Sequence, residues 1–187
     1  MKGIEIHGYA IVSDDDRIAD ESGAMPDLLR NDADWAYFQA ELDLAALVVL
    51  GRLGHEANAN PKKRARLVLS SSVPRLERRE DGWWWNPATV SWEDAVRTVL
   101  PEGGRIAVPG GRRVFDLFLG IGYDAFHLTR AEGVHIPRGV ALFSACDEGE
   151  TAEEVLTKSG LTIGPRQVID RNGPVSLTIW RRSAAAP

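Results

Sequence analysis

Short apolar runs along the chain predict strands of a buried sheet. The segment Ile4–Val12 predicts a first strand, interrupted by a glycine. Ala45–Leu50 is a continuous apolar run, which is typical of a strand covered on both faces, and Arg66–Leu69 repeats this pattern after its arginine. Arg105–Val108 and Ala125–Thr129 predict two more strands. Runs of this kind favour a sheet whose strands are mostly parallel.

Apolar residues at helical spacing follow the first strand. Asn31 or Asp32 can cap a helix over Ala33–Leu42. Trp35 and Phe38 are expected to share one face of this helix with its last residue, because they recur at helical spacing. The pattern therefore predicts a strand, a helix and then the next strand.

The same alternation continues through the middle of the chain. Trp92–Leu100 predicts a helix capped by Ser91, and Arg112–Leu119 predicts an amphipathic helix after a glycine turn. The polar stretch Ser13–Pro26 predicts a long loop, and a strand is expected to end at Val90. Alternating strands and helices indicate an α/β protein.

The C-terminal region has a different pattern. Leu161–Ile169 and Val175–Trp180 flank a turn at residues 171–174, which predicts an antiparallel hairpin. The predicted fold class is therefore α/β, a single domain with a mixed, mostly parallel central sheet, flanking helices and a C-terminal antiparallel hairpin. We expect the domain to span residues 1–182 and to be followed by a frayed tail at residues 183–187.

Composition narrows the class of protein. The chain has 187 residues, of which 44% are hydrophobic and 26% charged, as in an ordinary globular domain. The formal net charge of -5 argues against binding to nucleic acid or to an anionic membrane. Cys146 is the single cysteine, so neither an internal disulfide nor a cysteine zinc site is possible. We expect a cytoplasmic monomer or homodimer without a leader or membrane span.

Candidate chemistry lies where the predicted strands end. Open α/β sheets bind ligands at the carboxyl ends of their strands. Gly51 and Arg52 follow one predicted strand, and serines from Ser70 onward follow the next. Gly110 and Gly111 open a predicted helix, where free backbone N–H groups attract phosphate. Taken alone, the glycine pair indicates no more than a tight turn.

Several segments together resemble one enzyme family. In chain order they are Asp16–Pro26, Asp34–Phe38, Leu50–Arg52, Arg64–Ser71, Val108–Leu119, His127–Thr129 and Val175–Arg182. Their order and spacing resemble those of the dihydrofolate reductase family, from the first strand to Arg182. The resemblance implies an NADPH-dependent oxidoreductase that transfers a hydride to dihydrofolate or a related pteridine.

The resemblance also implies roles for particular residues. Asp34 matches the carboxylate that holds the pterin, and Thr129 matches the residue that hydrogen-bonds this carboxylate, so both are candidate catalytic residues. Phe38, Met25 and Arg64 match substrate-binding positions, with Arg64 gripping the glutamate carboxylate of a folate. From the residues alone, Asp34 could equally be a first-turn acidic residue, and Arg64 part of a solvated basic run.

The cofactor positions implied by the resemblance are more numerous. They are Ala19, Gly51, Arg52, Ser70, Ser71, Gly110, Gly111, Arg112 and Arg113. The resemblance further implies that the peptide bond between Gly110 and Gly111 is cis.

Departures from the family pattern leave alternatives open. The chain is longer than usual before Asp34, so Asp32 is a rival carboxylate. Asp27 and Gly54 stand where the family often has tryptophan and threonine. One alternative is a reductase of the same fold that acts on a phosphoribosylaminopyrimidine of riboflavin synthesis. Another is a catalytically silent relative that binds a nucleotide or pterin.

Histidines and tryptophans complete the candidates. His55 and Glu56 favour a polar helix start over a metal site. His7, His127 and His135 are scattered along the chain, and no metal site is expected from them. For Trp83–Trp85 we expect part of the cluster to be buried.

Overall fold

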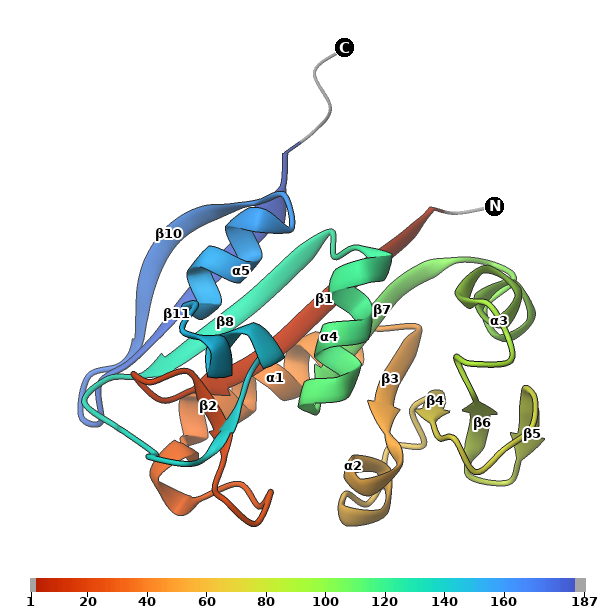
Figure 1. Cartoon of the computed structure of the whole chain (residues 1–187), viewed down its shortest axis with the longest axis horizontal. Helices are drawn as coiled ribbons and strands as arrows, with labels where there is room; N and C mark the ends of the chain where they lie inside the picture. The colour runs from red at the N-terminus through yellow and green to blue at the C-terminus, as the bar shows by residue number, and fades with distance from the viewer. Residues whose placement is uncertain (1–2, 184–187) are drawn as a thin grey trace.

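A nine-stranded mixed sheet forms the centre of the computed structural model, which describes residues 3–183. The strand order is β10-β11-β8-β1-β7-β3-β4-β6-β5, as Figure 1 shows. These strands are β1 (Ile4–Val12), β3 (Leu47–Gly51), β4 (Arg66–Leu69), β5 (Glu77–Arg79), β6 (Gly82–Trp85), β7 (Gly104–Gly110), β8 (Ala125–Ala131), β10 (Leu161–Asp170) and β11 (Val175–Arg182). β2 (Arg17–Ala19) and β9 (Val140–Ala141) form a separate two-stranded sheet.

Helices connect and cover these strands. They are α1 (Asp32–Asp43), α2 (Arg52–Ala57), α3 (Trp92–Val99), α4 (Arg112–Ile121) and α5 (Ala152–Lys158), with short 3₁₀ turns η1 (Asp27–Leu29) and η2 (Ser144–Glu148). The six strands from β8 to β6 run parallel, whereas β5, β11 and β10 pair antiparallel with their neighbours. This arrangement confirms the predicted α/β class and the C-terminal hairpin.

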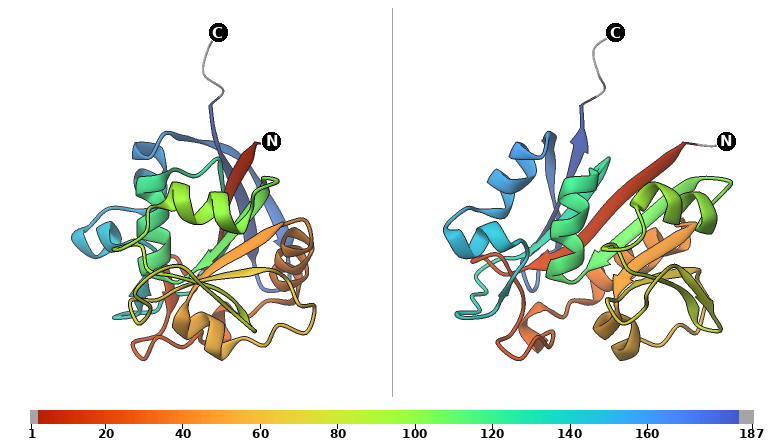
Figure 2. Two further views of the ribbon diagram at one scale, coloured as in Figure 1. Left: turned by 90° about the vertical axis from the view of Figure 1, so that its right-hand side faces the viewer. Right: turned by 45° about the vertical axis from the view of Figure 1, so that its right-hand side comes forward.

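The two faces of the sheet carry different helices. α4 and α5 lie on one face and α1 on the other, as Figures 1 and 2 show. Alternate residues of β1 serve the two faces, because side chains of a strand point in opposite directions. Ile6 and Val12 join the large core under α4 and α5, whereas Tyr9 joins the smaller cluster under α1.

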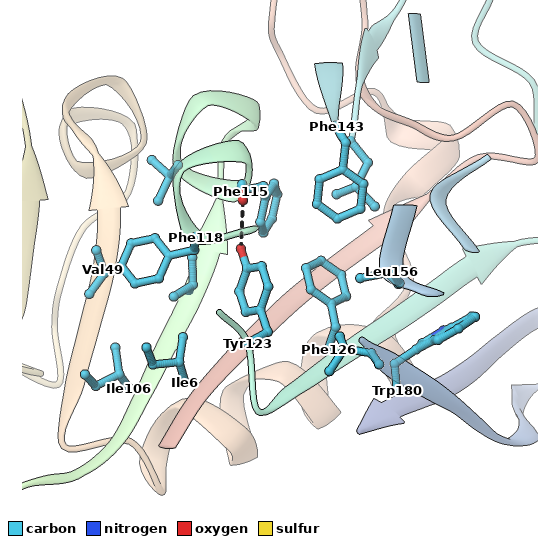
Figure 3. Packing of buried hydrophobic residues seen from close by; sticks show 14 of the residues in the cluster. Ile6, Val49, Ile106, Phe115, Phe118, Tyr123, Phe126, Phe143, Leu156 and Trp180 are labelled. Atoms are coloured by element: carbon cyan, nitrogen blue, oxygen red, sulfur yellow. Dashed lines mark hydrogen bonds between the residues drawn. The ribbon is translucent and has the colours of Figure 1, made fainter. Parts of the chain in front are cut away.

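Aromatic side chains fill the larger core. Phe115 and Phe118 of α4 pack with Phe126 of β8 and Phe143, as Figure 3 shows. The Tyr123 hydroxyl donates a hydrogen bond to the Phe115 carbonyl at 3.2 Å, which satisfies the only polar atom of this buried side chain. The glycine within β1 is required by this packing, because a Cβ at Gly8 would lie 2.3 Å from the Phe126 ring.

The structure corrects several predicted elements. The loop predicted over Ser13–Pro26 contains β2, whose partner β9 lies more than a hundred residues away in sequence. The strand expected to end at Val90 is a turn, because the Val90 amide donates to the Asn86 carbonyl at 3.1 Å. The strand is β6 itself, in which Trp84 and Trp85 are buried, so the expected partial burial of the tryptophans is confirmed.

Two further differences concern helices and the tail. α5 was not predicted, although Thr151 and Glu154 form a capping box whose sequence signature is visible. The tail predicted at residues 183–187 lies, apart from Ser183, outside the described residues. Within residues 3–183, every helix is too short or too polar to cross a membrane.

Candidate functional site

The helix α1 brings an acidic side chain to the carboxyl-terminal edge of the sheet. Asn31 caps α1, since its Oδ1 accepts a hydrogen bond from the Asp34 amide at 3.0 Å. The Asn31 amide nitrogen in turn donates to Asp170 Oδ2 at 2.7 Å, which ties the start of the helix to β10. One face of α1 carries four residues at helical spacing, namely Asp34, Tyr37, Phe38 and Glu41.

Asp34 meets Thr129 of β8. Thr129 is buried, and its side chain lies near the Asp34 carboxyl group. Burial raises the pKa of Asp34, and the nearby Thr129 hydroxyl partly offsets this rise by favouring the ionised form. The structure therefore brings together two residues that the resemblance also pairs. Such a carboxyl group can bind an amidine-like edge and hold a proton above its ordinary pH range.

The rival carboxylate occupies a different environment. Asp32 is exposed to solvent, whereas Asp34 is half-buried. Asn31 rather than Asp32 provides the cap of α1. The geometry therefore favours Asp34 as the carboxylate of a ligand site.

The prediction that Trp35 and Phe38 share one helix face with Leu42 is partly wrong. Trp35 is 57% exposed and does not share the buried face with Leu42. Phe38 is half-buried and packs against Tyr9 of β1, with ring centroids 6.1 Å apart. The first turn of α1 lies at the carboxyl ends of the strands. Trp35 therefore contacts Phe38 but faces solvent.

Two predicted substrate residues have contrasting surroundings. Met25 is 44% exposed in the loop before η1. The Arg64 guanidinium is only 16% exposed, and it bonds Asp43 through Nε at 3.1 Å and Gln39 Oε1 at 2.9 Å. Arg64 is therefore not part of a solvated basic run. Its charge is neutralised by the C-terminal end of α1 instead.

The predicted phosphate-binding turns lie side by side. Leu50 of β3 pairs with Gly110 of β7, and Gly51 pairs with Leu69 of β4. Gly51, Ser70 and the glycine pair therefore follow one another along the same edge of the sheet. Because glycines have no side chain, the helices that begin after Gly51 and Gly111 have no side-chain cap on their first N–H groups.

The glycine pair itself has the implied geometry. The peptide bond between Gly110 and Gly111 is cis. Gly110 has a φ of +105°, and a Cβ there would lie 2.5 Å from the Phe115 ring. Both properties favour glycine at position 110.

Charged and polar side chains near these turns are partly engaged. Arg52 bonds Glu56 of its own helix at 3.0 Å, and Arg112 bonds Asp147 at 2.7 Å, while Arg113 is exposed. Ser70 is buried and its hydroxyl lies 2.7 Å from that of Ser72. Ser71 is exposed.

Ala19, another predicted cofactor residue, lies in the small second sheet. It is buried in β2 against Val140. Arg17 of the same strand bonds Asp147, which also binds Arg112 at the start of α4. The loop that contains Ala19 is thereby tied to the candidate phosphate site.

A buried polar cluster beneath α1 was missed. The interpretation of His7 and His127 as scattered is wrong, because Tyr9 of β1 pairs with His127 of β8. His7 Nδ1 lies 3.2 Å from His127 Nε2, and the Tyr37 hydroxyl lies 2.5 Å from His127 Nδ1. Burial lowers the pKa of His127 to about 3 and also lowers that of His7, so both rings are neutral.

A cleft lies away from the residues of the candidate site and of the buried polar cluster. Its volume is 970 Å³, and it opens at the amino-terminal end of the parallel strands. Ile4, Trp92, Leu100, Asp124 and Arg182 are among its lining residues. It is lined by none of the residues predicted for the site.

Comparisons with known proteins define the fold class. No family model matches the chain, and no curated protein matches it. A putative riboflavin biosynthesis protein from Shewanella sp. PV-4 is 20% identical with a TM-score of 0.68, over 97% of this chain and 100% of that one. Dihydrofolate reductase from Enterococcus faecalis, complexed with NADP(H) and RAB-propyl, is 18% identical with a TM-score of 0.67, over 96% and 97%.

A third solved structure is longer. It is a diaminohydroxyphosphoribosylaminopyrimidine deaminase/5-amino-6-(5-phosphoribosylamino)uracil reductase from Thermotoga maritima, 16% identical with a TM-score of 0.67. The match covers 96% of this chain and 57% of that one. The chain therefore has the dihydrofolate reductase-like fold, which riboflavin-pathway proteins share.

Proposed function

We propose that this protein is an NADPH-dependent reductase that transfers a hydride to dihydrofolate or a related pteridine. The observation that carries the proposal is the half-buried Asp34 carboxyl group, held by Thr129 at the edge of the sheet where two glycine turns open helices. Fold alone does not establish activity, so the proposed function depends on the residues at the carboxyl ends of these strands.

The cofactor edge fits a dinucleotide phosphate. Gly51 and Gly111 leave the first N–H groups of α2 and α4 without a side-chain cap, and the pairing of Leu50 with Gly110 brings these turns together. Arg52 and Arg113 are exposed beside them and would add positive charge. NADPH, when bound, supplies the hydride.

The part of the site around Asp34 and Thr129 fits a heterocycle with an amidine-like group. Asp34 would accept two hydrogen bonds from such a group, with Thr129 fixing the carboxyl orientation. The negative charge of the ionised carboxylate would favour protonation of the neighbouring ring nitrogen, with water as the proton carrier. Reduction then consumes one hydride and one proton.

A second candidate substrate is a phosphoribosylaminopyrimidine. Arg64, which a folate glutamate would need, is already bonded to Asp43 and Gln39. A substrate without a glutamate tail makes no demand on that arginine. The likeness to riboflavin-pathway structures, at TM-scores of 0.68 and 0.67 against 0.67 for dihydrofolate reductase, supports including this substrate in the test.

The test is steady-state NADPH oxidation with dihydrofolate and with the phosphoribosylaminopyrimidine, beside a reaction without substrate. Reduction of dihydrofolate is the expected result, and reduction of the pyrimidine alone would replace it with the second candidate. Binding of NADPH without turnover of either substrate would indicate a silent binding protein. Failure to bind NADPH, measured by quenching of tryptophan fluorescence, would overturn the proposal.

A further inference from the structure

We propose that His7, His127 and Glu41 form a binding site for a divalent transition metal of the zinc class. His7 lies on β1, His127 on β8 and Glu41 in the last turns of α1. Each offers one ligand atom, and these atoms all lie within 4.8 Å of one another. This inference concerns a site beneath α1 and does not depend on the proposed reductase activity.

The spacing of the two imidazoles fits a tetrahedral metal. His7 Nδ1 and His127 Nε2 are 3.2 Å apart. Two nitrogens at the usual zinc distance of about 2.0–2.1 Å and at the tetrahedral angle lie about 3.3–3.4 Å apart. The histidines therefore need almost no change in spacing. The Glu41 carboxylate needs to move by at most about 1.5 Å to reach the same separation.

Every proposed ligand is already held through its other polar atom. His127 Nδ1 faces the Tyr37 hydroxyl, and His7 Nε2 faces Glu5 Oε2 at 3.8 Å. Glu41 Oε2 accepts hydrogen bonds from Tyr9 at 2.9 Å and from Arg105 at 3.2 Å. Outer partners of this kind orient ligands in metal sites and fix the histidine tautomer.

The donor set selects for zinc-like ions. Two imidazole nitrogens and one carboxylate oxygen, with a fourth position beside the Tyr9 hydroxyl, suit Zn²⁺ or Co²⁺ rather than Mg²⁺ or Ca²⁺. Both histidines are buried, and a neutral imidazole is the form that binds metal. Without metal, the cluster is satisfied by hydrogen bonds among Tyr37, His127 and His7.

Metal binding would join three elements that are distant in sequence. It would link β1 and β8 to α1, the helix that also carries Asp34, as the arrangement in Figure 1 indicates. Tyr37, which contacts His127, lies one turn from Asp34. The site would therefore stabilise the position of α1 on the sheet.

The test uses the full chain, with any affinity tag removed and treated with a chelator. We expect calorimetric titration with Zn²⁺ to give one ion per chain and Co²⁺ to give the visible absorption of a tetrahedral site. At a Zn²⁺ concentration about 100 times the Kd, the Tm is expected to rise by about 5–10 °C.

Variants distinguish this cluster from other metal-binding groups. His127→Gln and Glu41→Gln should each weaken Zn²⁺ binding at least about 100-fold. His55→Gln is the matched control, because His55 also bonds a carboxylate, Asp81 Oδ2 at 2.7 Å, and it should bind like the unmodified chain. Circular dichroism verifies that each variant is folded, and Glu41→Gln serves if the buried histidine variant is not.

Two results would overturn the proposal. One is that millimolar Zn²⁺ or Co²⁺ gives no heat of binding, no cobalt absorption and no change in Tm. The cluster would then be a hydrogen-bonded part of the core only. The other is binding that persists in both His127→Gln and Glu41→Gln, which would place the ion elsewhere on the chain.

Discussion

At the residue scale, the surroundings of a side chain decide its chemistry. Asp32 and Asp34 stand two positions apart in the first turn of α1, yet one is exposed and the other half-buried against Thr129. Burial disfavours the charged form of a carboxyl group, so of the two aspartates only Asp34 has the partly buried carboxyl group that the proposed ligand site needs. The sequence identified both aspartates but could not separate them, because the choice depends on the phase of the helix against the sheet.

Asparagine at position 34 should abolish most of the proposed turnover. Asp34→Asn removes the carboxylate that would bind the substrate and favour protonation of its ring nitrogen, so we expect turnover to fall by about 10²–10⁴-fold. NADPH affinity should stay within about twofold, because Asp34 would not contact the cofactor phosphates. Steady-state kinetics and fluorescence titration measure the two quantities. Asp32→Asn is the matched control and should keep its activity; the reverse outcome would exchange the two roles.

The raised pKa of Asp34 also predicts a pH dependence of stability. A carboxyl group whose pKa is higher in the folded than in the unfolded state binds more protons when folded. The free energy of unfolding therefore falls as pH rises from the ordinary carboxyl pKa through the raised one. Asp34→Asn lacks this loss, so its stability relative to the unmodified chain should increase between pH 4 and pH 7.

Urea unfolding of both proteins at the two pH values measures this difference. Asp32→Asn controls for the loss of one negative charge at the same end of the helix. An equal change for both variants would mean that burial of Asp34 has no effect on its titration.

At the element scale, turns and caps decide where ligands can bind. β3 and β7 end in glycines that lead directly into α2 and α4, and the pairing of Leu50 with Gly110 brings these turns together. Both glycine turns were recognised in the sequence, but their position side by side in the sheet was not. Local chemistry can predict a turn, whereas the distance between two turns depends on strand order.

Gly110 and Gly120 should respond in opposite directions to alanine. At Gly110, a φ of +105° and a Cβ 2.5 Å from the Phe115 ring should lower the free energy of unfolding by about 1–3 kcal/mol. At Gly120, within α4, a Cβ meets no atom within 4 Å, so alanine should raise it by about 0.5–1 kcal/mol. Denaturant unfolding compares the two variants. A stable Gly110→Ala would show that the turn relaxes freely.

At the scale of the whole molecule, one core joins the two edges of the sheet. The largest cluster of buried residues runs from Trp85 of β6, through Ile106 and Phe126, to Trp180 of β11. Contacts that extend across the width of the sheet favour cooperative unfolding. The expected domain over residues 1–182 can be tested on this basis.

We expect urea unfolding to show one transition. Tryptophan fluorescence reports on both edges, since Trp83–Trp85 and Trp180 lie near opposite ends of the strand order. The midpoint from fluorescence should coincide with the midpoint from far-UV circular dichroism. After correction for the change in stability that Trp180→Phe causes, the remaining tryptophans of this variant should report the same midpoint. An earlier transition of the β4–β6 edge would divide the domain into two units.

The sequence by itself determined the elements that depend on local pattern. The first strand, the strand before the serines, the glycine turn before α4 and the C-terminal hairpin follow from apolar spacing and turn residues, which act over a few positions. The ordered segments from Asp16 to Arg182 also indicated the fold class, and the structural comparisons support it. The capping box of α5 was equally visible in the sequence.

Only the tertiary structure decided which distant side chains meet. His7 and His127 are 120 residues apart, and they touch because β1 pairs with β8. The pairing of Arg64 with Asp43 and the burial of Asp34 against Thr129 likewise depend on how α1 packs on the sheet. Strand order and helix packing are set by the sum of many long-range contacts, so no local pattern contains them.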